Sequence, residues 1–82
     1  MNPADKIRTF LQELLTRRRD KKPFDDDSSL ILSGRLSSVE AVEIGVFLEE
    51  NFGVDFDDVG FDQAKIDSVN LILALASQSK NR

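Results

Sequence analysis

The sequence predicts an all-α fold, a small four-helix bundle with three longer helices, one short helix and a long loop between the first two. Apolar residues recur at helical spacing in three separate stretches. Isolated helices of these lengths are marginal in water, so they must bury their apolar stripes against one another. The length of 82 residues allows one domain, residues 1–82. Its ordered core is expected at about residues 4–77, and a frayed tail at 78–82.

The first helix is expected from about Ala4 to Arg18. Asn2 or Pro3 suits its start, and the arginines at its end oppose the negative end of the helix dipole. Its apolar stripe falls at i, i+3, i+4, i+7 and i+8, at Ile7, Phe10, Leu11, Leu14 and Leu15.

A long connection follows, from Arg19 to Leu36. Loops of this length are uncommon in small domains and are usually functional. Leu30, Ile31 and Leu32 are expected to hold it on the core. The basic stretch at residues 17–22 fits an anionic partner or a solvated helix end, and the sequence favours the solvated end.

The second helix is expected from about Ser37 to Asn51. Ser37 and Glu40 have the Ser-x-x-Glu spacing of a capping box, and Gly53 suits the left-handed residue that ends a helix. A short, weak helix is expected around residues 62–66, after an extended link at 54–56. The last helix is expected to start near Asp67 or Ser68, both good caps.

The second helix has two apolar faces. The first reads as core and contains Ala41, Ile44, Gly45, Leu48 and Phe52. The second mixes apolar and acidic residues and contains Val39, Glu40, Glu43, Val46 and Glu50. Valines ringed by carboxylates favour a docking surface for a partner with a basic patch, and the alternative is ordinary surface.

Composition excludes several classes of function. The chain has no histidine and no cysteine, so a serine–histidine triad and a thiolate metal site are impossible. Adjacent carboxylates point apart on a helix, so no enzyme and no metal site is predicted. Residues 34–82 carry four basic and nine acidic residues, which disfavours nucleic acid. No signal peptide or membrane span is seen, and a cytoplasmic monomer is expected.

Three motifs give the chain a resemblance to a known family. They are Gly34-Arg35-Leu36-Ser37-Ser38-Val39, then Val42-Glu43-Ile44, then Glu49-Glu50-Asn51-Phe52-Gly53. Together they resemble the acyl carrier proteins, in which Gly-x-x-Asp-Ser-Leu precedes a helix that ends in Glu-Glu-x-Phe-Gly. The likeness covers about Ile7 to Ala76.

The resemblance implies a 4′-phosphopantetheine arm on Ser38, added from coenzyme A by a phosphopantetheinyl transferase. The arm would carry acyl groups as thioesters to partner enzymes of fatty acid, polyketide or another specialised acyl pathway. Ser37 replaces the family's aspartate, and the alternative is a non-covalent helical interaction module or a carrier homologue without the arm. Asp67-Ser68-Val69 matches the motif more literally, but we interpret Ser68 as a cap.

Overall fold

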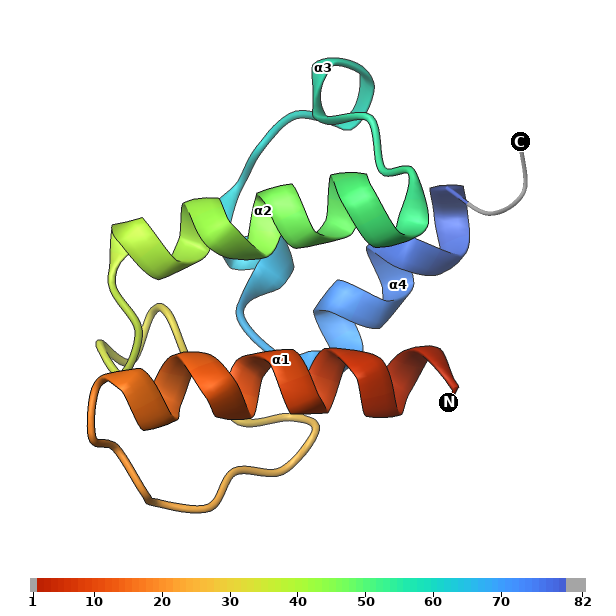
Figure 1. The fold of residues 1–82 in the computed structure, drawn as a ribbon. Coiled ribbons are helices and arrows are strands. Elements are labelled where there is room, and N and C mark those ends of the chain that lie inside the picture. The colour runs from red at the N-terminus through yellow and green to blue at the C-terminus, as the bar shows by residue number, and fades with distance from the viewer. Residues whose placement is uncertain (1, 80–82) are drawn as a thin grey trace.

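The computed structural model describes residues 2–79, apart from the side chains of residues 58, 59 and 79. Within these limits the chain is helical and contains no strand, so the predicted all-α class is confirmed. Its three longer helices are α1 (Pro3–Arg17), α2 (Ser38–Phe52) and α4 (Val69–Ser79). Between α2 and α4 lie two single turns, α3 (Phe56–Val59) and the 3₁₀ turn η1 (Gln63–Ile66). α1 and α2 run in opposite directions, with α4 behind them (Figure 1).

Caps fix the ends of the two long helices close to the predicted positions. α1 begins after Asn2, whose Oδ1 accepts the Asp5 N–H at 2.8 Å. α2 ends at Phe52, and the next residue, Gly53, has a φ of 68° and allows the chain to turn away in the left-handed conformation. No helix in the described part of the chain is both long and apolar enough to cross a bilayer.

The segment between α2 and α4 differs from the prediction. Phe56, expected in an extended link, opens α3, and the short helix expected around residues 62–66 is a 3₁₀ turn. An aspartate caps each turn separately. Asp55 accepts the Asp57 N–H at 3.0 Å, and Asp62 accepts the Ala64 N–H at 2.9 Å. α4 extends to Ser79, two residues into the predicted tail of residues 78–82, and residues 80–82 lie outside the described range.

The core lies where the three longer helices meet the end of the connection. The connection contributes Leu30, Ile31 and Leu36, each buried, so the prediction that apolar residues hold it on the core is confirmed for Leu30 and Ile31. The prediction is wrong for Leu32, which is 66% exposed. Val54, just after α2, is also buried, and the helices and η1 contribute the other buried apolar residues: Ile7, Leu11, Leu14, Leu15, Ala41, Ile44, Leu48, Ile66, Val69, Ile72, Leu75 and Ala76.

Asp67 fixes the connection just before α2. Its Oδ1 accepts the backbone N–H groups of Ile31 at 2.7 Å and Leu32 at 2.8 Å, and its backbone oxygen accepts that of Leu30 at 2.8 Å. Burial opposes ionisation of this carboxyl, but hydrogen bonds from Leu32, Ser29 and Ile31 outweigh it and lower the Asp67 pKa below its ordinary 3.8. The buried aspartate thereby holds residues 30–32 of the connection in place ahead of α2.

Candidate functional site

A reciprocal cap holds the start of α2. Ser37 Oγ accepts the Val39 N–H at 3.2 Å and also the Glu40 N–H. In return Glu40 Oε1 accepts the Ser37 backbone N–H at 2.7 Å and the Ser37 hydroxyl proton. These bonds satisfy N–H groups that a helix start otherwise leaves without partners. The predicted capping box is confirmed, with Ser37 as the residue before the helix.

Ser38 is the first residue of α2, and its side chain is exposed. Its Oγ accepts a hydrogen bond from Gln63 Nε2 in η1 at 3.2 Å, also at the surface. The chain has no histidine, the side chain that most often takes a serine proton. The site therefore presents an accessible hydroxyl that needs a base from elsewhere to become a nucleophile.

Two of the carboxylates predicted to dock a partner form ion pairs with arginines of the same chain. Glu40 Oε1 lies 3.2 Å from Arg18 Nη1, and Glu43 Oε1 lies 2.7 Å from Arg17 Nη2. The hydrogen bonds from the Ser37 side chain and backbone, with a smaller contribution from Arg18, lower the Glu40 pKa below its ordinary 4.5. α1 therefore already offers these two carboxylates the cations that a partner would supply.

An apolar ridge runs along the outer side of α2. Val39, Val42 and Val46 are 66%, 58% and 44% exposed. Val39 and Val46 were predicted to be exposed here. Val42 was not named with them, although its spacing of three residues from Val39 and four from Val46 puts it on the same helical face. Glu50, the last predicted docking residue, is exposed near the end of this face.

Shallow grooves lie on both sides of the ridge, and Val42 and Val46 line both. The groove on the α1 side has a volume of about 270 Å³. It also contains Phe47, whose ring stacks on Phe10 of α1 with 4.2 Å between ring centroids. The groove on the α3 side, about 200 Å³, is lined by Gly45, Glu49, Phe56 and Phe61 as well.

Phe61 is a site residue that the sequence did not reveal. Its ring packs edge-on against Phe56, with centroids 5.4 Å apart, and it is 44% exposed. A Cβ on Gly45 would lie 3.0 Å from Phe61 Cε1, so the absence of a side chain at Gly45 lets the ring approach α2. No local pattern places Phe61 beside Gly45, because the contact depends on the path of the chain after α3.

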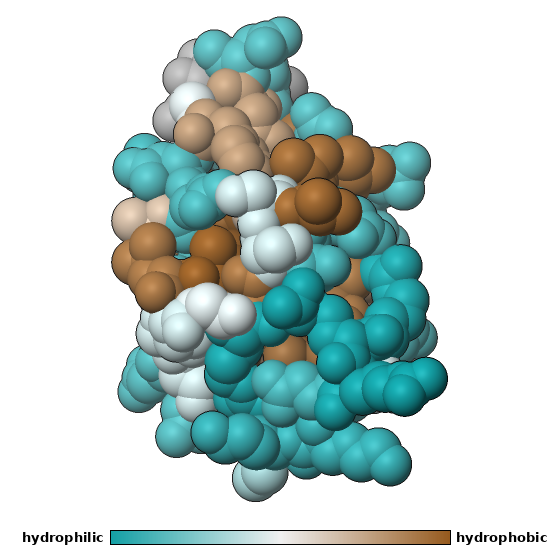
Figure 2. Space-filling view, turned by 90° about the vertical axis from the view of Figure 1, so that its left-hand side faces the viewer, coloured by the Kyte–Doolittle hydropathy of each residue, from teal (hydrophilic) through white to brown (hydrophobic). Residues whose placement is uncertain are grey.

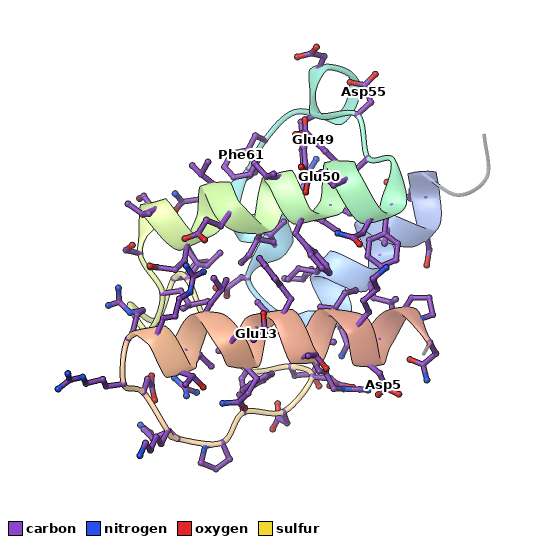
Figure 3. All side chains as sticks on the ribbon, viewed as in Figure 1. Asp5, Glu13, Glu49, Glu50, Asp55 and Phe61 are labelled. Atoms are coloured by element: carbon purple, nitrogen blue, oxygen red, sulfur yellow. The ribbon has the colours of Figure 1, made fainter. Side chains whose placement is uncertain are left out.

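Figure 2 faces the end of the molecule where α1 ends and α2 begins. Apolar atoms gather in its upper half, and hydrophilic atoms cover most of the lower half. Figure 3 shows Glu49, Glu50 and Asp55 over the second half of α2 and the start of α3. In Figure 2 most of the exposed apolar surface at this end of the molecule therefore lies above the hydrophilic surface.

The competing serine has a different environment. Ser68 is buried, at 5% exposure, and its Oγ accepts the Leu71 N–H at 3.2 Å at the start of α4. The interpretation of Ser68 as a helix cap is confirmed.

The described residues contain no cluster of three or more acidic, histidine or cysteine side chains that could hold a metal ion. The site consists of Ser38, its cap and the valine ridge.

No protein-family model matches this chain, and neither a curated protein nor a solved structure does so.

Proposed function

We propose that this chain is an acyl carrier protein, which holds 4′-phosphopantetheine on Ser38 and presents acyl groups to partner enzymes. The observation that carries the proposal is the exposed Ser38 hydroxyl on the first turn of α2. The motif resemblance selects this serine, and the burial of Ser68 removes the more literal alternative. The described chain has two short turns, α3 and η1, between α2 and α4, and the proposal assigns them to the part of the carrier fold where a short helix is expected.

The residues around Ser38 fit a phosphodiester on its oxygen. The first turn of α2 carries partial positive charge from its N–H groups, which favours an anion by roughly 0.3–1 kcal/mol. The nearest carboxylate along the chain is Glu40, and Arg18 already pairs with it. Ser37 replaces the family's aspartate but still caps the helix, so the entry geometry does not need the aspartate.

Loading requires a base that the chain does not supply. Ser38 Oγ would attack the pyrophosphate phosphorus of coenzyme A that carries the pantetheine. A new O–P bond forms as the bond to 3′,5′-ADP breaks, and the hydroxyl proton passes to a base of the transferase. The hydrogen bond from Gln63 occupies one of the two lone pairs of this oxygen and leaves the other for the attack. Once attached, the group supplies a terminal thiol that holds an acyl chain as a thioester.

The valine ridge supplies a reversible docking contact for such a shuttle. Small apolar surfaces with few charges give weak association, which allows a carrier to leave each enzyme. Basic patches on partner enzymes would be drawn to Glu49 and Glu50, which are exposed at the far end of the ridge from Ser38.

A non-covalent interaction module is the second candidate. The exposed side chains of Val39, Val42 and Val46 favour it, because they would serve a binding partner whether or not Ser38 is modified. In this case, Ser38 is only the first residue of a helix.

An intact-mass measurement distinguishes the carrier protein from the non-covalent module. The protein is measured after incubation with coenzyme A, magnesium and a broad-specificity phosphopantetheinyl transferase. We expect a gain of one phosphopantetheine mass. Ser38→Ala abolishes the gain, and the matched control Ser68→Ala, if it folds, keeps it. A protein that stays unmodified with several transferases, and bare in preparations from its native cell, would favour the non-covalent module.

A further inference from the structure

Gln63 is a side chain that the fold brings to the Ser38 hydroxyl from a distant part of the sequence. Its Nε2 donates to Ser38 Oγ at 3.2 Å, across 25 residues. The chain is anchored on both sides of Gln63, because the Phe61 ring packs beside Gly45 and Ile66 is buried in the core. The amide therefore reaches Ser38 from an anchored segment, on the side of the valine ridge where α3 lies.

The backbone donors at the start of α2 are already engaged. Ser37 Oγ accepts the N–H groups of Val39 and Glu40, and the Ser37 backbone oxygen accepts that of Ala41. The helix start therefore offers a phosphate on Ser38 its partial positive charge, but the cap already binds these N–H groups. A side-chain donor close to Ser38 Oγ adds a directed hydrogen bond that these N–H groups do not supply.

The arginines near this end of α2 also have other partners. Arg17 and Arg18 form ion pairs with carboxylates of α2. Arg35, in the connection, donates to the Asp20 carboxylate at 3.0 and 3.2 Å. A phosphate would compete with these carboxylates for the guanidinium groups, whereas Gln63 already contacts the oxygen that would carry the phosphorus.

We infer that Gln63 is a positioning residue for the arm: its side-chain amide donates to the phosphodiester on Ser38 and holds the arm on the α3 side of the ridge. This inference rests on the proposed carrier function. The non-ester oxygens of a phosphodiester carry its negative charge, and a charged acceptor forms a stronger hydrogen bond than a neutral one. They lie two covalent bonds from Ser38 Oγ, so the amide can move its hydrogen bond from the hydroxyl to the charge.

Asp62 places a carboxylate next to this amide along the chain. The residue is exposed, and its Oδ1 accepts the Ala64 N–H at 2.9 Å, which caps η1. A neighbouring carboxylate opposes a phosphate, so the arm is held by the directed bond from Gln63 and not by a local surplus of positive charge. Hydrogen bond and charge can therefore be separated by variants at two adjacent residues.

The first test follows side-chain amide signals by NMR in ¹⁵N-labelled protein, before and after loading by the transferase. The Nε2 signals of Gln63 are expected to move on loading, because the acceptor changes from a hydroxyl to a charged oxygen. Gln12, whose exposed amide contacts Thr16 on α1, is the control in the same spectrum and should stay in place. A mass gain that leaves the Gln63 signals unmoved overturns the inference and leaves the carrier function standing. A protein that gains no mass overturns the carrier function, and the inference with it.

Variants at the two adjacent residues use the ³¹P signal of the loaded protein as the readout. Gln63→Ala removes the donor and is expected to move this signal toward its position in urea-unfolded protein. Asp62→Asn removes the charge but keeps an oxygen that can cap η1, and is expected to move the signal clearly less. Neither side chain is buried, so both variants are expected to fold. An equal or larger effect of Asp62→Asn overturns the inference, because local charge would then set the environment of the phosphate.

The side on which the arm leaves gives an independent readout. The chain has no cysteine, so a thiol-reactive nitroxide attaches only to the arm. The label is expected to broaden the amide signals of η1 more than those of the last turn of α1, and Gln63→Ala should reduce this difference. Equal broadening on the two sides in the natural sequence overturns the inference.

Discussion

Two helices of this chain begin with closely related sequences, Ser37-Ser38-Val39 at α2 and Asp67-Ser68-Val69 at α4. At α2 the last serine is exposed, and its hydroxyl contacts only a surface amide among the described residues. At α4 the serine is buried and caps the helix, while Asp67 binds the backbone of the connection. The difference teaches that burial and bonded partners, more than the letters of a motif, decide whether a serine is available for chemistry.

The largest expected effect is at the start of α4. Asp67→Ala leaves the N–H groups of Ile31 and Leu32 without their acceptor, and each unsatisfied buried donor costs about 1–3 kcal/mol. We expect the free energy of unfolding, measured by urea denaturation, to fall by about 2–4 kcal/mol. Asp67→Asn keeps an acceptor oxygen, so its free energy of unfolding should fall clearly less than that of Asp67→Ala. Equal losses in the two variants would mean that the acceptor is not what holds the connection.

A smaller effect is expected at the start of α2, where cap and attachment point are neighbouring residues. Ser37→Ala removes the cap and should cost about 1 kcal/mol of unfolding free energy. Ser38→Ala loses only an exposed hydrogen bond from Gln63 and should stay within about 0.5 kcal/mol of the natural sequence. Thermal unfolding of the two variants is the measurement. If Ser38→Ala destabilises as much as Ser37→Ala, the Ser38 hydroxyl has a structural role.

Local signals in the sequence predicted both helix starts. Ser37 and Glu40 form their capping box, and Ser68 caps α4, because a cap depends on residues within one turn. The turn α3 was not predicted, and η1 was predicted in place but not as a 3₁₀ turn, since each depends on a single aspartate and lacks an apolar stripe that would mark its type.

Contacts between distant segments could not be predicted from the sequence. The pairs of Arg17 with Glu43 and Arg18 with Glu40 join α1 to α2 only once the two helices are packed in opposite directions. Their consequence is large, because two carboxylates that resemble a docking surface in the sequence are neutralised in the fold.

The smallest expected effect is a difference in the pH at which acidification removes the stabilising contributions of Glu40 at α2 and Asp67 at α4. Hydrogen bonds from Ser37 lower the Glu40 pKa below 4.5, and backbone hydrogen bonds lower the Asp67 pKa below 3.8 despite burial. A carboxyl with a lowered folded pKa stabilises the protein above its unfolded pKa, and this contribution disappears as the pH falls through the folded value. The contribution of Glu40 should therefore begin to decline at a higher pH than that of Asp67.

Urea unfolding of the natural sequence, Glu40→Gln and Asp67→Asn between about pH 7 and pH 3 measures the two contributions separately. The stability advantage of the natural sequence over Glu40→Gln should start to shrink near pH 4.5, and its advantage over Asp67→Asn nearer pH 3.8. An advantage that grows on acidification would have the wrong sign for a lowered pKa. Simultaneous decline of both advantages would contradict the expected order of the two carboxyl groups.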